Sequence, residues 1–242
     1  MSTRTENIEV SGIQVEVVRK QIKNLHLSVH PPEGRVRVSA PTRTDDEAVR
    51  LAVVSKLRWI QKHQQTFADQ PRQSPREMVG GESHYFLGRR YRLQITERDR
   101  PTKVTLRGNS AMILQVRPGT TRDKRQQILN DWYRRYMKEI IPDLIQKWEP
   151  TIGVRVNDWG VKKMKTRWGS CNIRDRRIWL NLDLAKKPPH CLEYVLVHEM
   201  VHLLERHHND RFKSFMDQFL PQWRLYRDDL NQAPLSYDDR GY

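Results

Sequence analysis

The segment Tyr194–Leu204 most restricts the fold of this chain, because it reads as a helix that is apolar around almost its whole circumference. Its polar side chains are those of His198, Glu199 and His202. A helix that is apolar on all sides must be covered on all sides by other elements. Imidazole and carboxylate groups inside such packing are costly to desolvate unless they have partners. The sequence therefore predicts a buried helix that carries a polar or metal site.

The two histidines of this helix have the His-Glu-x-x-His spacing of a metal site. Residues four apart on an α-helix lie about 40° apart in azimuth and about 6 Å apart along the axis, so both imidazoles project from one face. Catalytic zinc sites combine three protein ligands, often imidazoles, with one open position. We expect one Zn²⁺ ion per chain, held by His198 and His202, with Glu199 as the catalytic base. The alternative is a metal-free network of satisfied polar groups.

Spacing alone leaves the third metal ligand open. Glu205 lies seven residues after the first histidine of the motif and stays on the same helical face, whereas His208 requires the chain to turn back. Asparagine tolerates left-handed backbone and aspartate caps helices, so Asn209–Asp210 is typical of one helix ending and another beginning. That pair favours a bend that presents His207 or His208.

Residues 1–118 form the first expected region, which is rich in mostly antiparallel β-structure and has one helix. Apolar and polar residues alternate over residues 6–40, 85–95, 104–107 and 112–116. Thr44–Glu47 has capping-box spacing, and apolar residues then recur at helical intervals up to about Phe67. The polar residues 68–77 include two prolines, which predict a connection rather than a packed element. No internal repeat is apparent.

Residues 119–230 form the second expected region, a catalytic domain with a small sheet, and residues 231–242 form a polar tail. From Thr121 onward, two adjacent columns of apolar residues predict a long helix that packs lengthwise on a core. We expect Pro142 to kink or split this helix, because proline removes a helical hydrogen bond.

Strands and helices then surround the motif. The expected strands are residues 154–156, 161–171 and 178–184. Pro188–Pro189 opens the motif helix, since proline is tolerated in the first helical turn. A further helix follows Asp210. The fold class is therefore α+β.

The chain is strongly basic. Its 44 lysines and arginines against 29 aspartates and glutamates give a formal charge of +15 and a pI near 10.1. Residues 151–187 carry ten basic and three acidic residues, a local charge of +7. Such a surface favours an anionic partner, such as a nucleotide or nucleic acid.

The sequence lacks the features of secreted and membrane proteins. Its two cysteines, Cys171 and Cys191, are too few for a disulfide framework. The N-terminus has no apolar signal segment, and no run approaches the roughly 18 apolar residues of a membrane span. We expect a cytoplasmic protein without membrane association.

Ordered motifs in the second region are similar to those of a known family. They comprise Thr166–Cys171, Asn181, Leu184, Pro188, Tyr194, His198, Glu199, His202, His208 and Phe212. Arg35–Pro41 and Tyr85–Tyr91 fit the same pattern, so the resemblance spans most of the chain. The pattern resembles the YgjP-like metallopeptidase domain, also known as DUF45 or the M48-like group.

The resemblance implies a zincin-like catalytic domain and carries the third zinc ligand onto His208, ten positions after the first histidine. The family has Asn-His-Ser where this chain has a histidine at position 207, so His207 stays an alternative ligand. Glu205 then becomes the residue expected to accept a hydrogen bond from a ligating histidine.

The resemblance also implies a substrate-binding strand at Arg167, Trp168, Gly169 and Ser170, placed as edge strands are in zinc metallopeptidases. Glycine permits close backbone approach, and an extended peptide can add as a further strand. In the alternative interpretation, Trp168 packs in the core and Gly169 marks a bulge.

Three functions follow from these features. The motif favours zinc-dependent hydrolysis of peptide bonds in a polypeptide substrate. A nucleoside triphosphate pyrophosphatase, an activity proposed within the resembling family, suits the basic segment, although the chain has no G-x-x-x-x-G-K phosphate loop. The third is a nucleic-acid-associated protease or a pure binding module, and a binding module would not need Glu199.

Overall fold

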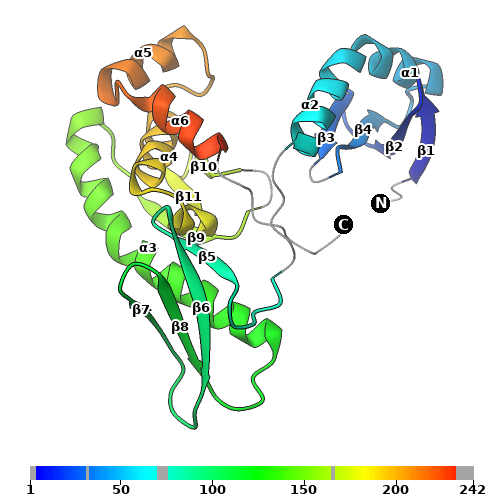
Figure 1. The fold of residues 1–242 in the computed structure, drawn as a ribbon. Coiled ribbons are helices and arrows are strands. Elements are labelled where there is room, and N and C mark those ends of the chain that lie inside the picture. Colours follow the sequence, from blue (N-terminus) through cyan, green and yellow to red (C-terminus); the bar gives the residue numbers. More distant parts are fainter. Residues whose placement is uncertain (1–3, 31–32, 70–75, 165–166, 233–242) are drawn as a thin grey trace. The chain divides into compact units, whose positions relative to one another are not determined.

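The computed structural model describes residues 4–30, 33–69, 76–164 and 167–232 (Figure 1). The chain divides into two compact units, Met1–Gln73 and Ser74–Tyr242. The division lies within the expected polar connection and not at residue 118, because the strands between residues 83 and 116 belong to the core of the second unit. Thr166 of the family pattern and most of the expected tail lie outside the described ranges.

The N-terminal unit begins with a four-stranded sheet. Its strands are β1 (Arg4–Val10), β2 (Ile13–Lys20), β3 (His26–His30) and β4 (Arg35–Pro41), in the order β1-β2-β4-β3. The outer pairs are antiparallel, whereas the central pair β2–β4 is parallel. Val15, Val36 and Val53 are fully buried members of its core.

Two helices, α1 (Asp46–Ser55) and α2 (Leu57–Asp69), replace the single helix expected after this sheet. The N-cap is Asp45, whose carboxylate accepts a hydrogen bond from the N–H of Ala48 at 2.7 Å. Lys56, with φ −111° and ψ 11°, departs from helical values. The regular helical hydrogen bonding is therefore interrupted between α1 and α2.

The second unit begins with a sheet of the same strand order. Its strands are β5 (Ser83–Phe86), β6 (Arg89–Glu97), β7 (Lys103–Arg107) and β8 (Ala111–Val116), in the order β5-β6-β8-β7 with β6 and β8 parallel. The single strand expected over residues 85–95 is therefore a hairpin that turns at Leu87–Gly88. These two residues have φ values of 52° and 77°, as a two-residue hairpin turn requires.

The tip of this hairpin docks on the segment that leads into the motif helix. The N–H groups of Leu87 and Gly88 donate to the carbonyl oxygens of Ala185 and Lys186, at 3.0 and 3.1 Å. A Cβ at Gly88 would lie 2.8 Å from Pro188, so only glycine allows this approach. The first sheet of the unit and the part that contains the motif helix consequently share one core.

The long helix α3 (Arg122–Ile152) starts after its N-cap Thr121 and contains Pro142, which does not split it. One of its two apolar columns, which includes Tyr133 and Met137, is buried. The side chains of the other column are partly buried and pack against the same core. The predicted lengthwise packing is confirmed. Residues 154–156, expected as a strand, lie in the loop after α3.

A three-stranded sheet follows, made of β9 (Asp158–Lys162), β10 (Gly169–Asn172) and β11 (Arg177–Asn181), in the order β10-β11-β9. The strand expected over residues 161–171 is interrupted between β9 and β10. The strand expected over residues 178–184 ends at Asn181, because the Asn181 side chain accepts a hydrogen bond from the N–H of Asp183. That bond starts the 3₁₀ helix η1 (Leu182–Lys186).

Three helices complete the unit: α4 (Pro189–Val201), α5 (Asp210–Phe219) and α6 (Trp223–Gln232). α4 contacts α3, α5, α6, η1, β10 and β11, and Figure 1 shows it among these elements. The predictions of a covered motif helix and of an α+β fold are confirmed. α6 was not expected, and it includes the first residues of the expected tail. No helix within the described ranges is long and apolar enough to cross a membrane.

Candidate metal centre

Three imidazoles converge at the C-terminal end of α4. His198 lies in its last turn, His202 is its C-cap, and His208 lies in the loop before α5. Ring nitrogens of the three residues lie within 4.8 Å of one another. The Nε2 atoms of His198 and His208 are 2.9 Å apart. Across the described ranges, this is the cluster of three potential metal ligands that the fold assembles.

The chain turns back after α4 to bring the third histidine to the other two. The N–H groups of Leu204 and Glu205 both donate to the carbonyl oxygen of Val201, at 2.9 and 3.0 Å, which tightens and ends the helix. Asn209 then caps α5 by accepting a hydrogen bond from the N–H three residues later, at 3.0 Å. The predicted bend is confirmed, with Asn209 rather than Asp210 as the cap.

Phe212, on the first turn of α5, packs against all three imidazoles. Its ring centroid lies 4.9 Å from that of His198 and 4.8 Å from those of His202 and His208. The ring is buried, so it closes the apolar side of the cluster and restricts the imidazole rotamers. Sequence reasoning included Phe212 in the family pattern without assigning it a role.

Burial keeps the imidazoles of α4 neutral. Desolvation lowers the pKa of His198 to about 3, and the neighbouring His202 and His208 add to the shift. Desolvation is also the largest cause of the lowered pKa of His202. A neutral imidazole offers a lone pair to a metal ion, whereas a protonated one does not.

Hydrogen bonding around the cluster fits a metal site. The Nδ1 of His202 lies 3.1 Å from the carbonyl oxygen of Glu205, which can only accept, so Nδ1 carries the proton and Nε2 keeps its lone pair. The Nδ1 of His198 is buried and has no hydrogen-bond partner among the described residues. The Nε2 atom of His198 faces that of His208 instead. Three neutral imidazoles are a donor set that zinc takes.

Glu205 and His207 lie outside the cluster. The Glu205 carboxylate accepts a hydrogen bond from the N–H of His207 at 3.1 Å. Sequence reasoning expected the Glu205 side chain to accept a hydrogen bond from a ligating histidine, but the main-chain carbonyl of Glu205 accepts it instead. Any side chain at position 205 can therefore supply it.

Glu199 is buried against β10. Glu199 is 6% exposed, and a Cβ at Gly169 would lie 2.5 Å from its Oε1 atom. Gly169 thus makes room for the carboxylate, a role that neither sequence interpretation of this glycine included. Burial raises the pKa of Glu199 to about 8, against the opposing effect of the Arg167 charge. A carboxyl group in this range can both take and give a proton near neutral pH.

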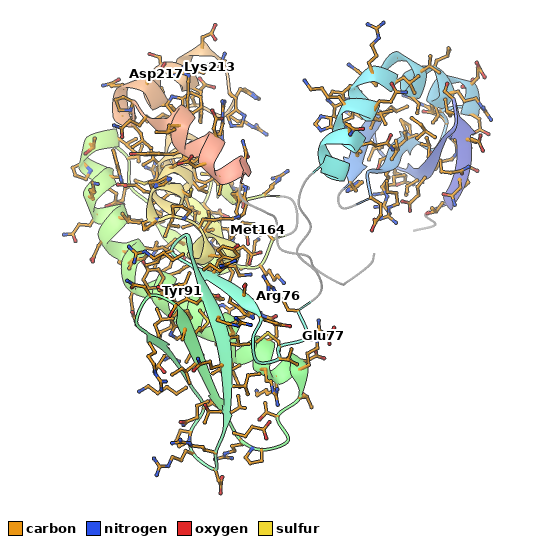
Figure 2. All side chains as sticks on the ribbon, in the orientation of Figure 1. Arg76, Glu77, Tyr91, Met164, Lys213 and Asp217 are labelled. Atoms are coloured by element: carbon orange, nitrogen blue, oxygen red, sulfur yellow. The ribbon has the colours of Figure 1, made fainter. Side chains whose placement is uncertain are left out.

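Asn181 holds the segment that precedes β10. Its Nδ2 donates to the carbonyl oxygens of Met164 at 2.9 Å and Arg167 at 2.8 Å, and its N–H donates to that of Trp168 at 2.9 Å. Figure 2 labels Met164, which begins this segment. Sequence reasoning included Asn181 in the family pattern without assigning it this role, because the burial of the amide is seen only in the structure.

Trp168 packs partly buried against the core of the unit. Its ring lies 5.3 Å from the Nζ of Lys187, an ammonium group whose pKa burial lowers to about 8. The same tryptophan lines the cleft above the three histidines. It therefore packs within the unit and faces the cleft as well.

A cleft of about 610 Å³ opens over the histidine cluster. Its walls include His198, His202, His208 and Glu199, together with the whole expected substrate segment Arg167–Ser170. The fold thus gathers the candidate ligands, the candidate base and the candidate substrate residues around one cavity.

Two further side chains line the cleft. Tyr194 lies one turn before the first histidine of the motif, and burial raises its pKa to about 12, so the phenol stays a hydrogen-bond donor. Burial and the nearby Glu199 raise the pKa of Cys171 to about 11, which keeps the thiol protonated and weakly reactive.

Comparisons with known proteins place the chain in a family. No curated protein matches it. The crystal structure of the metallopeptidase zymogen of Pyrococcus abyssi abylysin is similar, with 17% sequence identity and a TM-score of 0.35 over 37% of this chain and 90% of that one. Residues 23–233 match the model of the YgjP-like, metallopeptidase domain. Because that match covers most of the chain, the protein belongs to the YgjP-like metallopeptidase domain family.

Proposed function

We propose that this protein is a zinc-dependent peptidase, in which His198, His202 and His208 hold one Zn²⁺ ion per chain and Glu199 is the general base. The observation that carries the proposal is the convergence of three imidazoles and one carboxylate in a cleft beside the edge strand β10. Membership of a metallopeptidase family supports the reaction class.

A bound zinc ion supplies a Lewis acid, which polarises a carbonyl group and makes water more acidic. Glu199 takes a proton from the attacking water and passes it to the leaving amine. Because Gly169 has no side chain, the Glu199 carboxylate has room at the cleft wall. The main-chain carbonyl of Glu205 holds His202 in the tautomer that leaves Nε2 free.

The edge strand β10 suits an extended polypeptide. Among the strands that the structure describes, β10 pairs with β11 alone. A substrate strand can hydrogen-bond with the other side, as peptides do in strand addition. Arg167–Ser170 would then contact the residues next to the bond that is cleaved.

The other two hypotheses require other substrates. A nucleoside triphosphate, or a nucleic acid with bound protein, would use the basic surface. A dedicated phosphate loop needs glycines whose backbone is open to the ligand. Gly169 is the single glycine of the cleft wall, and the Glu199 carboxylate occupies the space beside it, so we favour the peptide.

A cytoplasmic location is part of the proposal. Cys171 and Cys191 are both free thiols. Free thiols fit a reducing compartment, and fractionation of cells that express the full chain tests the location.

The experiment compares zinc-loaded wild type and Glu199→Gln on a peptide library and on nucleoside triphosphates. Glutamine matches the shape of glutamate but cannot take the proton, so we expect unchanged zinc content and at least about 100-fold slower peptide cleavage. Glu139→Gln, an exposed change on α3, is the matched control. Equal activity of wild type and Glu199→Gln contradicts the role of Glu199, and nucleotide turnover without peptide cleavage contradicts the substrate.

A further inference from the structure

Three arginines surround the cleft, and each comes from a different segment. Arg167 precedes β10, Arg206 lies in the loop between α4 and α5, and Arg227 lies on α6. Glu199 is the single carboxylate among the lining residues. The walls of the cleft are therefore positively charged before any metal ion is added.

The charges of these arginines are largely available to a ligand. Within the part of the chain that the structure describes, the guanidinium groups of Arg167 and Arg206 have no carboxylate partner. The Nε and Nη2 of Arg227 both donate to one oxygen of Asp228, at 3.1 Å each. The Arg167 charge thus acts on the nearby Glu199 without an ion pair, and the Arg227 charge is shared with an exposed aspartate.

Arginines from three different segments suit several separate carboxylates of one ligand better than one compact anion. A polyphosphate is bound by donors that converge on a single point, often backbone N–H groups of a glycine-rich turn. Here the donors come from three separate segments of the chain, and an extended peptide along β10 would present successive side chains to opposite sides. Arginine binds carboxylates through paired N–H groups, which adds geometric selectivity.

We propose that the cleft selects polypeptides with aspartate or glutamate near the cleaved bond, and that Arg167, Arg206 and Arg227 recognise these side chains. The inference rests on the proposed peptidase function and names its substrate class. Zinc and Glu199 act on the peptide bond, and the arginines determine which bond is presented.

The test is binding of labelled peptides to the zinc-loaded Glu199→Gln protein, followed by fluorescence anisotropy. Three peptides of equal length carry acidic, neutral or basic residues around the same central pair. We expect the acidic peptide to bind at least about tenfold more tightly than the neutral one, and the basic peptide to bind most weakly. Added salt should narrow these differences, because exposed charges are screened.

Charge reversal identifies the residues responsible. Arg206→Glu and Arg227→Glu should each reduce the preference for the acidic peptide by about tenfold. Arg107→Glu, the same charge change at the exposed end of β7, should leave the preference intact. Zinc content measured in each variant separates an effect on recognition from an effect on the metal.

Several results would overturn the inference. These are equal binding of the three peptides, an equal effect of Arg107→Glu, or tighter binding of a nucleoside triphosphate that Arg206→Glu abolishes. Binding is measured on a variant with an altered base, so it does not depend on turnover. Wild type that cleaves no peptide, with the acidic preference present, would count against the proposed function and not against the recognition.

Discussion

At the residue scale, Gly169 connects the substrate wall with the general base, since its missing side chain leaves the space that Glu199 occupies. In Gly169→Ala the new Cβ would meet the carboxylate at 2.5 Å, so either the carboxylate or β10 must shift. We expect peptide turnover to fall by at least about tenfold while zinc content is unchanged. At Gly80 a Cβ meets nothing within 4 Å, so Gly80→Ala is the control. Full activity of Gly169→Ala would show that the carboxylate position is not critical.

Asn181 offers a second residue-scale prediction. Aspartate has the same shape but cannot donate, so Asn181→Asp loses the hydrogen bonds to the carbonyl oxygens of Met164 and Arg167. The loss should lower the free energy of unfolding in urea by about 1–3 kcal/mol and speed hydrogen exchange before β10. Asn7→Asp, an exposed change in the N-terminal unit, is the comparison. Unchanged exchange before β10 would argue against the role of Asn181 in holding this segment.

His84, on β5, gives the stability of the second unit a pH dependence. Burial lowers its pKa from 6.5 to about 4, and the charge of Arg76, labelled in Figure 2, adds to the shift, while Glu82 opposes it. The unfolded chain then binds the proton at higher pH than the folded chain. The contribution of neutral His84 to the free energy of unfolding is complete above about pH 6.5 and is lost as the pH falls toward 4.

The measurement is the free energy of unfolding in urea at pH 7 and at pH 5. Wild type should lose more stability between these values than His84→Gln, which cannot titrate. His207→Gln, an exposed change, should behave as wild type does. An equal loss in wild type and His84→Gln would assign the acid sensitivity to other groups.

At the scale of elements, the motif helix was predictable because its composition permits only a buried helix. The bend after it was predictable from Asn209–Asp210, although the cap is one residue earlier than expected. The end of β11 was not predictable, because the alternation of apolar residues continues through Leu184. At this point the Asn181 side chain caps η1 and ends the strand. Alternation of apolar and polar residues contains no information about such a local hydrogen bond.

The cap of α5 also supports the metal centre. Asn209→Ala removes the hydrogen bond that starts α5, which carries Phe212 against the imidazoles. We expect a loss of about 0.5–2 kcal/mol in stability and weaker zinc binding in a chelator competition. Thr121→Ala removes the cap of α3 and should cost similar stability without affecting zinc. Equal zinc affinity in the two variants would show that the cap does not position the site.

At the scale of the whole molecule, the two four-stranded sheets share one strand order that the sequence did not reveal. Both begin with a hairpin whose two turn residues have φ values of 52° and 77°, Ser11–Gly12 and Leu87–Gly88. The alternation of apolar and polar residues predicts strands and their buried face. It does not specify which strands pair or whether they pair parallel or antiparallel. The repeated arrangement and the division at residue 73 therefore required the structure.

Because the two units have separate cores, the second should fold without the first. A chain of residues 74–242 is expected to unfold cooperatively in urea and to bind zinc as tightly as the full chain. Circular dichroism and zinc titration check this expectation. Non-cooperative unfolding, or zinc binding weakened by orders of magnitude, would mean that the first unit is part of the folding domain.

The central claim is that His198, His202 and His208 hold one zinc ion, and the most direct test is zinc stoichiometry and affinity in single variants. We expect one zinc per wild-type chain, an affinity lower by orders of magnitude in His208→Ala, and little change in His207→Ala, because the His207 imidazole lies outside the cluster. Tight stoichiometric zinc in His208→Ala, or its loss in His207→Ala, would contradict this assignment.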